Sequence, residues 1–502
     1  MNYRQPQKAE VRHKTLLKAI EILTSDRQNA CCVKRNYPRK VYDYFYLLNE
    51  SKEKDEVSKV SEYYLRDWEK LHDTFIGNKR PEDLIICYLS GPEPKNDFNE
   101  LVKMGVLPQN IWAFENDKNT YGKAINELDN MLFPKPKILR MPIEQFLKNT
   151  PKKFDIIYID ACGSIPSEQH ALRCISSICK YHRLNSPGVI LTNFAEPDFE
   201  HIEIKDEYIE LLSLYFWCKN YPNDEVIIKN NEIGSKYYTI IKNEVTKDIK
   251  KHYGEFVRRI TMDISSVFIP ILRMCNSSYM DTLGKPKISN EKISLDKIKQ
   301  IKNNSLWKFC SMASWLKDNL QDINSGKIEL LLKECMGLDG FKYDINTCFD
   351  MIMQIKNDEG VLNELAKDVK GYFEKEENLY QFLDKPSSSL FFDTIINQLA
   401  YPLHYVTNSI DSYRYKAKET NMYLDTLVVD ECRYIYEWLP TINQMICAFE
   451  DLSWQYVFRF ALDGLVKCRI RYNNETYFRG SVICDSIDGF KECNLKDRNI
   501  IS

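Results

Sequence analysis

Short apolar runs separated by amphipathic stretches dominate the chain between residues 81 and 242. The runs predict strands, and most stretches between them repeat apolar residues at three- and four-residue spacing, which predicts helices. Short buried strands that alternate with helices indicate a mostly parallel sheet covered on both faces. Only a hairpin-length gap separates the last two strands, so we expect that pair to be antiparallel. The expected strands are 84–89, 111–115, 137–140, 155–160, 188–193, 225–229 and 237–242, and the expected helices are 96–104, 119–130, 143–148, 166–181 and 205–218.

The regions outside this α/β segment have a different pattern. A chain of 502 residues exceeds the size of a single core, so several domains are expected. Residues 1–80 and 243–465 carry mainly helical spacing, which predicts a helical N-terminal region and a large helical domain. The tail, 466–502, alternates polar and apolar residues around Asn473-Asn474 and predicts a small β-rich end with a short hairpin.

Composition narrows the class of protein. A net charge of −3 gives no global basic field, so any nucleic-acid binding must depend on a local patch. No run approaches the roughly 18 apolar residues of a membrane helix, and the start lacks the apolar core of a signal peptide. We therefore expect a cytoplasmic protein. The 16 cysteines are scattered without a CxxC pair, and the 7 histidines include no HxxxH or HExxH, so we expect reduced thiols and no metal site.

Candidate chemistry lies where the expected strands end. The first strand stops at Ser90-Gly91 and a helix follows, which is how a nucleotide-binding α/β domain begins. Glu115 ends the second strand, where a carboxylate can accept hydrogen bonds from both hydroxyls of a ribose. Asp160 ends the fourth strand, at the edge of a parallel sheet where ligands bind.

This order of elements resembles the class I S-adenosylmethionine-dependent methyltransferase fold, a seven-stranded Rossmann-like sheet whose last two strands are antiparallel. The resemblance covers residues 81–242 and implies S-adenosylmethionine as the cofactor. It also implies that Ser90 and Gly91 approach the methionine end of the cofactor and that Glu115 binds the ribose. Asp160 would then contact the cofactor and hold the target nitrogen.

The segment "IDACGSIP" after the fourth strand is similar to the "DPYGSP" of tRNA guanine N2-dimethylating enzymes, with Ala161 and Cys162 in place of Pro and Tyr. This similarity implies methylation of an amine on an RNA or DNA base. Cys162 could instead be a nucleophile, as in enzymes that methylate pyrimidine C5. The Pro-Cys motifs of those enzymes are missing here, so we do not expect covalent catalysis.

A mixed aromatic and basic stretch lies near the end of the expected helical domain. Tyr413, Arg414, Tyr415 and Lys416 would provide rings for stacking on bases and cations for phosphates, so they are the candidate substrate-binding residues. The alternative is a set of partly buried tyrosines beside cations whose stems cover apolar surface. The helical domain could also bind a protein partner.

The leading hypothesis is therefore a methyltransferase that acts on a nucleic acid. A second hypothesis is an interaction or sensor protein that keeps the fold without its chemistry. Three departures motivate it: Cys87 replaces an acid late in the first strand, Glu93-Pro94 follow the turn, and Pro142 stands where an Asp often contacts the adenine amine. A nicotinamide- or nucleotide-binding enzyme is a third hypothesis, which the antiparallel final strands disfavour.

Overall fold

A computed structural model gives the fold. It describes residues 5–36, 39, 62–167, 171–218, 235–269, 272–273, 276, 326–336, 403–406, 409–437, 471–472, 483–484 and 495–501. The strands are β1 Ile86–Leu89, β2 Ile111–Phe114, β3 Lys137–Leu139, β4 Phe154–Asp160, β5 Leu184–Ala195, β6 His404–Tyr405, β7 Asp411–Ala417, β8 Thr420–Asp430, β9 Arg471–Tyr472, β10 Ile483–Cys484 and β11 Asn499–Ile501.

The helices before β5 are α1 Pro6–Leu23, α4 Glu62–Ile76, α5 Lys95–Lys103, α6 Lys118–Asp129, α7 Ile143–Asn149 and α8 Ala171–Lys180. The later ones are α9 Ile202–Cys218, α11 Ser235–Lys247, α12 Ile249–Asp263, α17 Gly326–Met336 and the short α21 Arg433–Tyr436. Single turns of 3₁₀-helix span Arg27–Asn29, Pro81–Asp83 and Pro108–Asn110, and a π-helical turn at Ile264–Phe268 continues α12.

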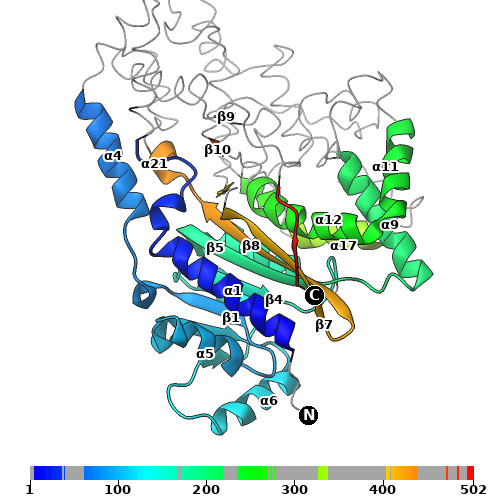
Figure 1. Cartoon of the computed structure of the whole chain (residues 1–502), viewed down its shortest axis with the longest axis horizontal. Helices are drawn as coiled ribbons and strands as arrows, with labels where there is room; N and C mark the ends of the chain where they lie inside the picture. The colour runs from blue at the N-terminus through cyan, green and yellow to red at the C-terminus, as the bar shows by residue number, and fades with distance from the viewer. Residues whose placement is uncertain are drawn as a thin grey trace, which may run out of the picture.

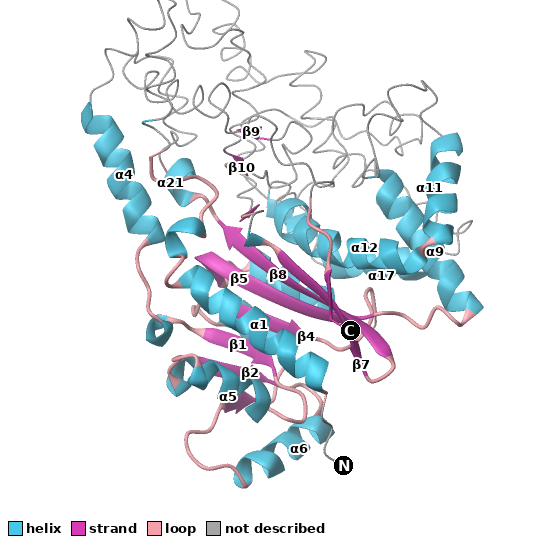
Figure 2. Cartoon of the chain, viewed as in Figure 1, coloured by secondary structure: helices cyan, strands magenta, loops and turns pink. Residues whose placement is uncertain are grey.

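One sheet organises the described part of the chain (Figure 2). Its strand order is β11-β7-β8-β5-β4-β1-β2-β3, and β6 adds a ninth strand against β8. Strands β3, β2, β1, β4 and β5 are all parallel, as the apolar runs predict. The predicted fold class is confirmed: the protein has an α/β fold with a mixed sheet whose strands β3, β2, β1, β4 and β5 are parallel.

The antiparallel edge of the sheet comes from a different part of the chain than the pattern predicts. Residues 237–242, predicted as the seventh strand, lie in helix α11, and 225–229 lie outside the described residues. Instead β7 and β8 form an antiparallel hairpin, and β8 pairs antiparallel with β5. The helical prediction for 243–465 is therefore wrong at these two strands. In the tail, β9 and β10 pair antiparallel, and β11 joins the main sheet beside β7.

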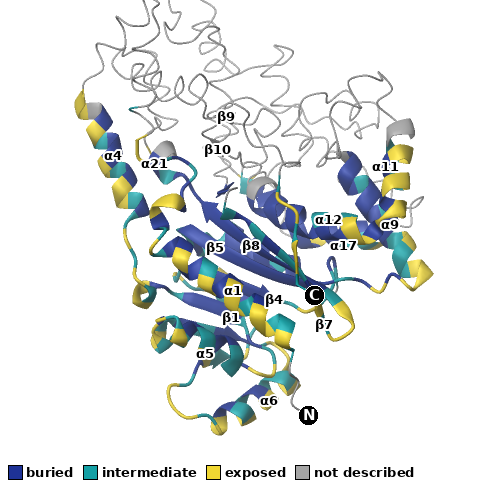
Figure 3. Ribbon diagram, in the orientation of Figure 1, coloured by how far each residue is buried: buried dark blue, intermediate teal, exposed yellow. Residues whose placement is uncertain are grey.

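Helices cover both faces of the sheet, which explains the continuous apolar runs in its strands (Figures 1 and 3). On one face α1 and α5 pack on side chains such as Ile86, Ile156 and Val189. On the other face α7, α8, α9, α12 and α17 pack on Ile157, Ile190 and their neighbours. Successive residues Ile156 and Ile157 point to opposite faces, as the two-residue period of a strand requires.

Helix α1 lies on one face of the sheet and runs roughly along the direction of β5 and β8 (Figure 1). It contains 18 residues, a length of about 27 Å at 1.5 Å per residue. Its buried positions include Val11, Leu16, Ala19 and Leu23, which recur at three-, four- and five-residue intervals and face the sheet. The first turn of α1 lies at the end of β7, because Gln7 Oε1 accepts the backbone N–H of Lys416 at 3.1 Å.

Two further observations concern membrane helices and cysteines. None of the described helices is long and apolar enough to cross a membrane. The cysteines in the described part of the chain, which include Cys87, Cys162 and Cys174, are free thiols.

Candidate functional site

The carboxyl ends of the parallel strands meet at one edge of the sheet, and three candidate positions lie along it. Asp160 is the last residue of β4, Ser90 follows β1 directly, and Glu115 follows β2 directly. Asn193 is the register partner of Asp160 on β5. We call this edge the rim; it is defined by Ser90, Gly91, Glu115, Asp160 and Asn193. The strand order therefore brings the two carboxylates to the same side of one sheet.

The turn after β1 has the backbone geometry of a ligand-binding loop. Gly91 has φ +57°, a left-handed conformation that costs other residues about 1–2 kcal/mol. A Cβ added to Gly91 would meet nothing within 4 Å, so the space above the turn is open. The backbone N–H of Ser90 donates to Phe114 O at 2.9 Å, and the Tyr88 hydroxyl donates to Pro94 O at 2.7 Å. These two bonds fix the turn to the sheet.

Glu115 is half-buried at the end of β2. Its backbone N–H donates to Leu139 O at 3.0 Å, which continues the pairing with β3. One oxygen of its carboxylate, Oε1, accepts the backbone N–H of Asp117 at 2.8 Å. Asp117 in turn caps α6, because its side chain accepts the N–H of Thr120. The carboxylate is therefore oriented by the loop, and a second oxygen is available for a ligand hydroxyl.

Asp160 is the centre of a polar network to which the N-terminal helix contributes. Oδ2 lies 2.8 Å from the Lys8 ammonium, and Oδ1 accepts the Asn193 amide at 2.8 Å and the Cys162 thiol at 3.0 Å. Only 11% of the Asp160 side chain and 20% of the Lys8 side chain are exposed. Burial lowers the pKa of Lys8, but the charge of Asp160 and its hydrogen bond to the ammonium raise it further, so the pKa lies above its ordinary value. Lys8 is therefore an ammonium held at the rim.

The same network keeps Cys162 in its protonated thiol form. Desolvation and the neighbouring Asp160 carboxylate raise the pKa of Cys162 to about 12. A thiol with so high a pKa is almost entirely protonated at pH 7, and the protonated form is a poor nucleophile. This agrees with the interpretation that excluded covalent catalysis.

Further polar side chains lie close to Asp160, and no sequence motif identifies them. Asp97 on α5 is buried 3.6 Å from the Arg12 guanidinium of α1. Burial raises the pKa of Asp97 to about 6, because it outweighs the Arg12 charge and the charge of Asp160 adds to it. The Tyr158 hydroxyl and Asn193 Oδ1 are buried without a hydrogen-bond partner among the described residues. Unpaired buried polar atoms are uncommon in folded proteins, and these two lie beside the rim.

The candidate substrate-binding residues lie on β7 instead of a helix, so their side chains alternate between the two faces of the sheet. Tyr415 is 1% exposed and its hydroxyl accepts from Asn193 Nδ2 at 2.9 Å, which leaves its ring unavailable for stacking on a base. Tyr413 donates to Asp411 at 2.8 Å. Arg414 lies 3.3 Å from Glu196, and Lys416 is exposed, 3.3 Å from Glu419. The assignment of these four residues to substrate binding stays a prediction: Tyr415 is buried in this structure, and Lys416 is the one of the four whose side chain faces solvent.

Comparisons with known proteins give distant structural matches only. No protein-family model and no curated protein matches this chain. Among solved structures, an S-adenosylmethionine-dependent methyltransferase from Clostridium acetobutylicum is 16% identical with a TM-score of 0.19, over 32% of this chain and 58% of that one. The magnesium protoporphyrin IX methyltransferase of Synechocystis matches with bound S-adenosylmethionine (14% identity, TM-score 0.19, 32% of this chain and 77% of that one). Its form with bound S-adenosylhomocysteine matches at 13% identity and TM-score 0.19, over 34% and 77%.

The chain thus spans less than two thirds of the first of these proteins. At such identities and scores the matches support no conclusion about this chain. The strand order and the rim residues are the basis of the functional argument.

Proposed function

We propose that this protein is an S-adenosylmethionine-dependent methyltransferase whose acceptor is an amine nitrogen of an RNA or DNA base. The observation that carries the proposal is the rim itself. Asp160 and Asn193 are register partners at the ends of β4 and β5. Glu115 and the Gly91 turn stand at the ends of the neighbouring strands β2 and β1. Ligands of parallel α/β sheets bind in the crevice at this edge.

The residues of the rim fit an adenosyl cofactor. The open space above Gly91 lets a ligand approach the backbone closely, where an added Cβ would interfere. Glu115 offers a carboxylate oxygen to ribose hydroxyls, and Asn193 Oδ1 offers an unpaired acceptor beside Asp160. The bound cofactor would supply a methyl group on a sulfonium. The protein would bind it, exclude water and orient the acceptor.

The contact between Lys8 and Asp160 supports an amine acceptor. The Lys8 ammonium is a primary amine, and it donates to Asp160 Oδ2 at 2.8 Å, within the range of a charge-assisted hydrogen bond. A base amine that replaced Lys8 would donate an N–H to the same oxygen and direct its lone pair away from Asp160. Lys416, exposed at the end of β7 on the same edge, would add a cation for a phosphate.

Calorimetry with the full chain tests the cofactor. We expect S-adenosylmethionine to bind, and we expect Glu115→Ala to weaken binding about tenfold or more through the lost ribose hydrogen bonds. Glu203→Gln, an exposed carboxylate on α9, is the matched control and should bind as the wild type does. No binding up to millimolar cofactor would refute the proposal.

Methyl transfer tests the acceptor. We expect transfer from labelled cofactor to bulk RNA or DNA, and we expect Asp160→Asn to abolish it while cofactor binding persists. Labelling of added protein but not of nucleic acid would leave the cofactor assignment in place and refute the acceptor class.

A second candidate function follows from the same contact. Lys8, Asn193 and Cys162 satisfy both oxygens of Asp160, so the rim could be a closed structural network in an interaction protein. Lys8→Met distinguishes the two functions. The interaction protein would stay inactive after this change, whereas the enzyme would retain or gain methyl transfer.

A further inference from the structure

A second cluster of chemically distinctive side chains lies at the opposite edge of the sheet from the rim. Asp430 is the last residue of β8, which runs antiparallel to β5, with Gly188 opposite Val429 and Ala195 opposite Met422. The end of β8 therefore lies at the amino ends of the parallel strands, whereas Asp160 lies at their carboxyl ends. No step of the proposed methyl transfer uses this cluster.

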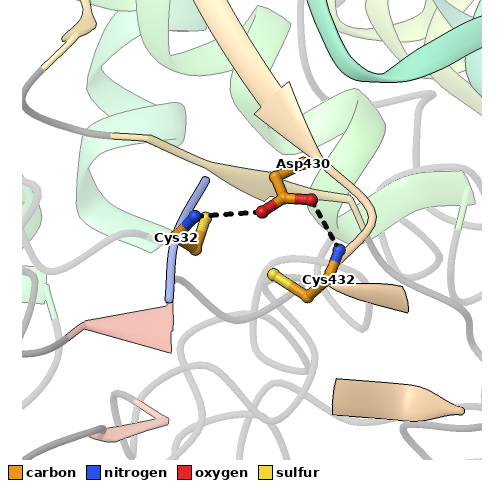
Figure 4. Close-up of side chains that lie close together, drawn as sticks. All are labelled: Cys32, Asp430 and Cys432. Atoms are coloured by element: carbon orange, nitrogen blue, oxygen red, sulfur yellow. Dashed lines mark hydrogen bonds between the residues drawn. The ribbon is translucent and has the colours of Figure 1, made fainter. Parts of the chain in front are cut away.

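We propose that Cys32, Asp430 and Cys432 form a binding site for one thiophilic divalent cation, of which Zn²⁺ is the representative (Figure 4). Two thiol sulfurs and one carboxylate oxygen lie within 4.8 Å of one another. Tetrahedral zinc with Zn–S bonds of about 2.3 Å holds its ligand atoms about 3.8 Å apart, so a small contraction would complete the set. Two sulfurs and one oxygen are a donor set that zinc accepts.

The backbone around the cluster holds the two thiols side by side. Asp430 Oδ2 accepts the backbone N–H of Cys32 at 2.9 Å, and Oδ1 accepts that of Cys432 at 2.9 Å (Figure 4). One carboxylate thus joins two segments that are 400 positions apart in the sequence. Cys432 has φ +48°, an uncommon conformation for a residue with a side chain. Cys432 and Asp430 are buried and Cys32 is at most partly exposed, so the cluster lies inside the fold.

Asp430 could bind a metal ion through one oxygen and keep its hydrogen bonds from the two backbone N–H groups. Besides the two N–H groups it accepts the Ser186 hydroxyl at 3.0 Å and the Tyr434 hydroxyl at 2.5 Å. A hydroxyl can rotate to another acceptor, whereas a backbone N–H cannot. The negative charge of Asp430 is partly balanced by Arg27, whose buried guanidinium interacts electrostatically with the Asp430 carboxylate.

The site would have a structural role. Cys32 follows α1, the helix that brings Lys8 to the rim, and Cys432 begins the turn into α21. A cation held by both would fix the far end of α1 to the sheet. With three protein ligands and water in the fourth position, the cation would stabilise the fold by joining two segments that no regular hydrogen-bond ladder connects.

Metal titration of the full chain tests the site. The protein is purified under reducing conditions, stripped with a chelator, and titrated with Co²⁺ and then Zn²⁺. We expect a Co²⁺ spectrum with thiolate charge-transfer bands that Zn²⁺ abolishes. We expect Cys32→Ser and Cys432→Ser each to weaken binding at least about tenfold, because each removes a ligand. Cys174→Ser, a buried thiol on α8 outside the cluster, is the matched control and should bind as the wild type does.

Thiol mapping keeps the test decisive if a variant does not fold. In the wild type, Zn²⁺ should protect Cys32 and Cys432 from alkylation, as read by peptide mass spectrometry. Protection of other cysteines only, a Co²⁺ spectrum without thiolate bands, or equal binding in the variants would overturn the proposal. A disulfide between Cys32 and Cys432 in protein isolated without air would overturn it too, because the pair would then be a redox couple.

Discussion

The stability of this protein should depend on the protonation of one buried carboxyl group, Glu334 on α17. Its side chain is 0% exposed, and its oxygens accept the backbone N–H groups of Ser167 at 3.1 Å and Leu172 at 3.2 Å. Burial raises the pKa of Glu334 from 4.5 to about 7, since the two N–H groups and nearby cations only partly offset the desolvation of the charge. The folded protein therefore holds this proton more tightly than the unfolded chain does.

The sign and the size of the effect follow from linkage. A raised carboxyl pKa contributes stability that is fully present below pH 4.5 and is lost as the pH rises toward 7. A shift from 4.5 to about 7, at 1.36 kcal/mol per pKa unit, amounts to about 3 kcal/mol. Glu334→Gln keeps an acceptor but cannot ionise, so it removes this dependence. Between pH 5 and pH 8 the variant should gain about 2–3 kcal/mol of unfolding free energy relative to the wild type.

Urea unfolding at the two pH values measures this difference. Other titrating groups, such as Asp97 with a pKa of about 6, are present in both proteins and cancel in the comparison. Glu203→Gln on α9 controls for the loss of one glutamate at the surface. If the free-energy difference between wild type and Glu334→Gln is the same at pH 5 and pH 8, within about 0.5 kcal/mol, the reasoning is refuted.

Three further changes test the rim and the far edge of the sheet. Gly91→Ala should lower the free energy of unfolding by about 1–2 kcal/mol, because φ +57° strains a residue with a Cβ, and should weaken cofactor binding in calorimetry; unchanged values would contradict the role of the turn. Lys8→Met should raise the rate of methyl transfer roughly tenfold, because it frees Asp160 from a charge-assisted hydrogen bond; a loss of activity would make Lys8 part of the active site instead. Asp430→Ala should cost about 3–5 kcal/mol in urea unfolding, since it leaves two buried backbone N–H groups without an acceptor, and a loss below about 1 kcal/mol would contradict that account.

The parallel half of the sheet could be predicted from the sequence because its strands are buried on both faces. The four residues 156–159 within the expected strand 155–160 are consecutive, apolar or aromatic and buried, so they indicate a strand without information from the rest of the fold. The prediction failed for "YYTIIK", 237–242, which forms part of α11. Short apolar runs occur both in strands and in buried helices, so the pattern of this run alone does not distinguish the two.

The antiparallel hairpin could not be predicted in the same way. Strand β7 has the sequence DSYRYKA, whose charged residues reflect an edge position beside the short β11. Its identity as a strand depends on pairing with β8 and β5, and β5 lies more than two hundred positions earlier in the sequence. Such pairing leaves no local pattern, so the sequence does not predict a strand here, and the assignment of its tyrosines and cations to substrate binding stays a prediction.

The candidate site could also be predicted only in part from the sequence. Glu115 directly follows β2 and Asp160 ends β4, so the expected ends of the strands were sufficient to identify both residues as candidates. Lys8 and Asn193 complete the network from segments with no motif of their own, and no spacing rule connects Lys8 with a residue 152 positions later. The packing of α1 on the sheet brings these groups together. Amphipathic spacing predicts that this segment is a helix, but it does not predict which residues the helix contacts.

The helices between α9 and β7 hold the loop that follows Asp160, and this limits what can be removed from the chain. The Tyr253 hydroxyl on α12 accepts the Ile165 N–H at 2.9 Å and donates to Ala195 O at 3.0 Å. On α17, Glu334 accepts the N–H groups of Ser167, in the same loop, and of Leu172, in the first turn of α8. Without these helices, buried backbone groups of the loop would lose their partners, at about 1–3 kcal/mol each. Helices α12 and α17 therefore support the loop that follows Asp160, and we expect a chain truncated after residue 242 to lose this support.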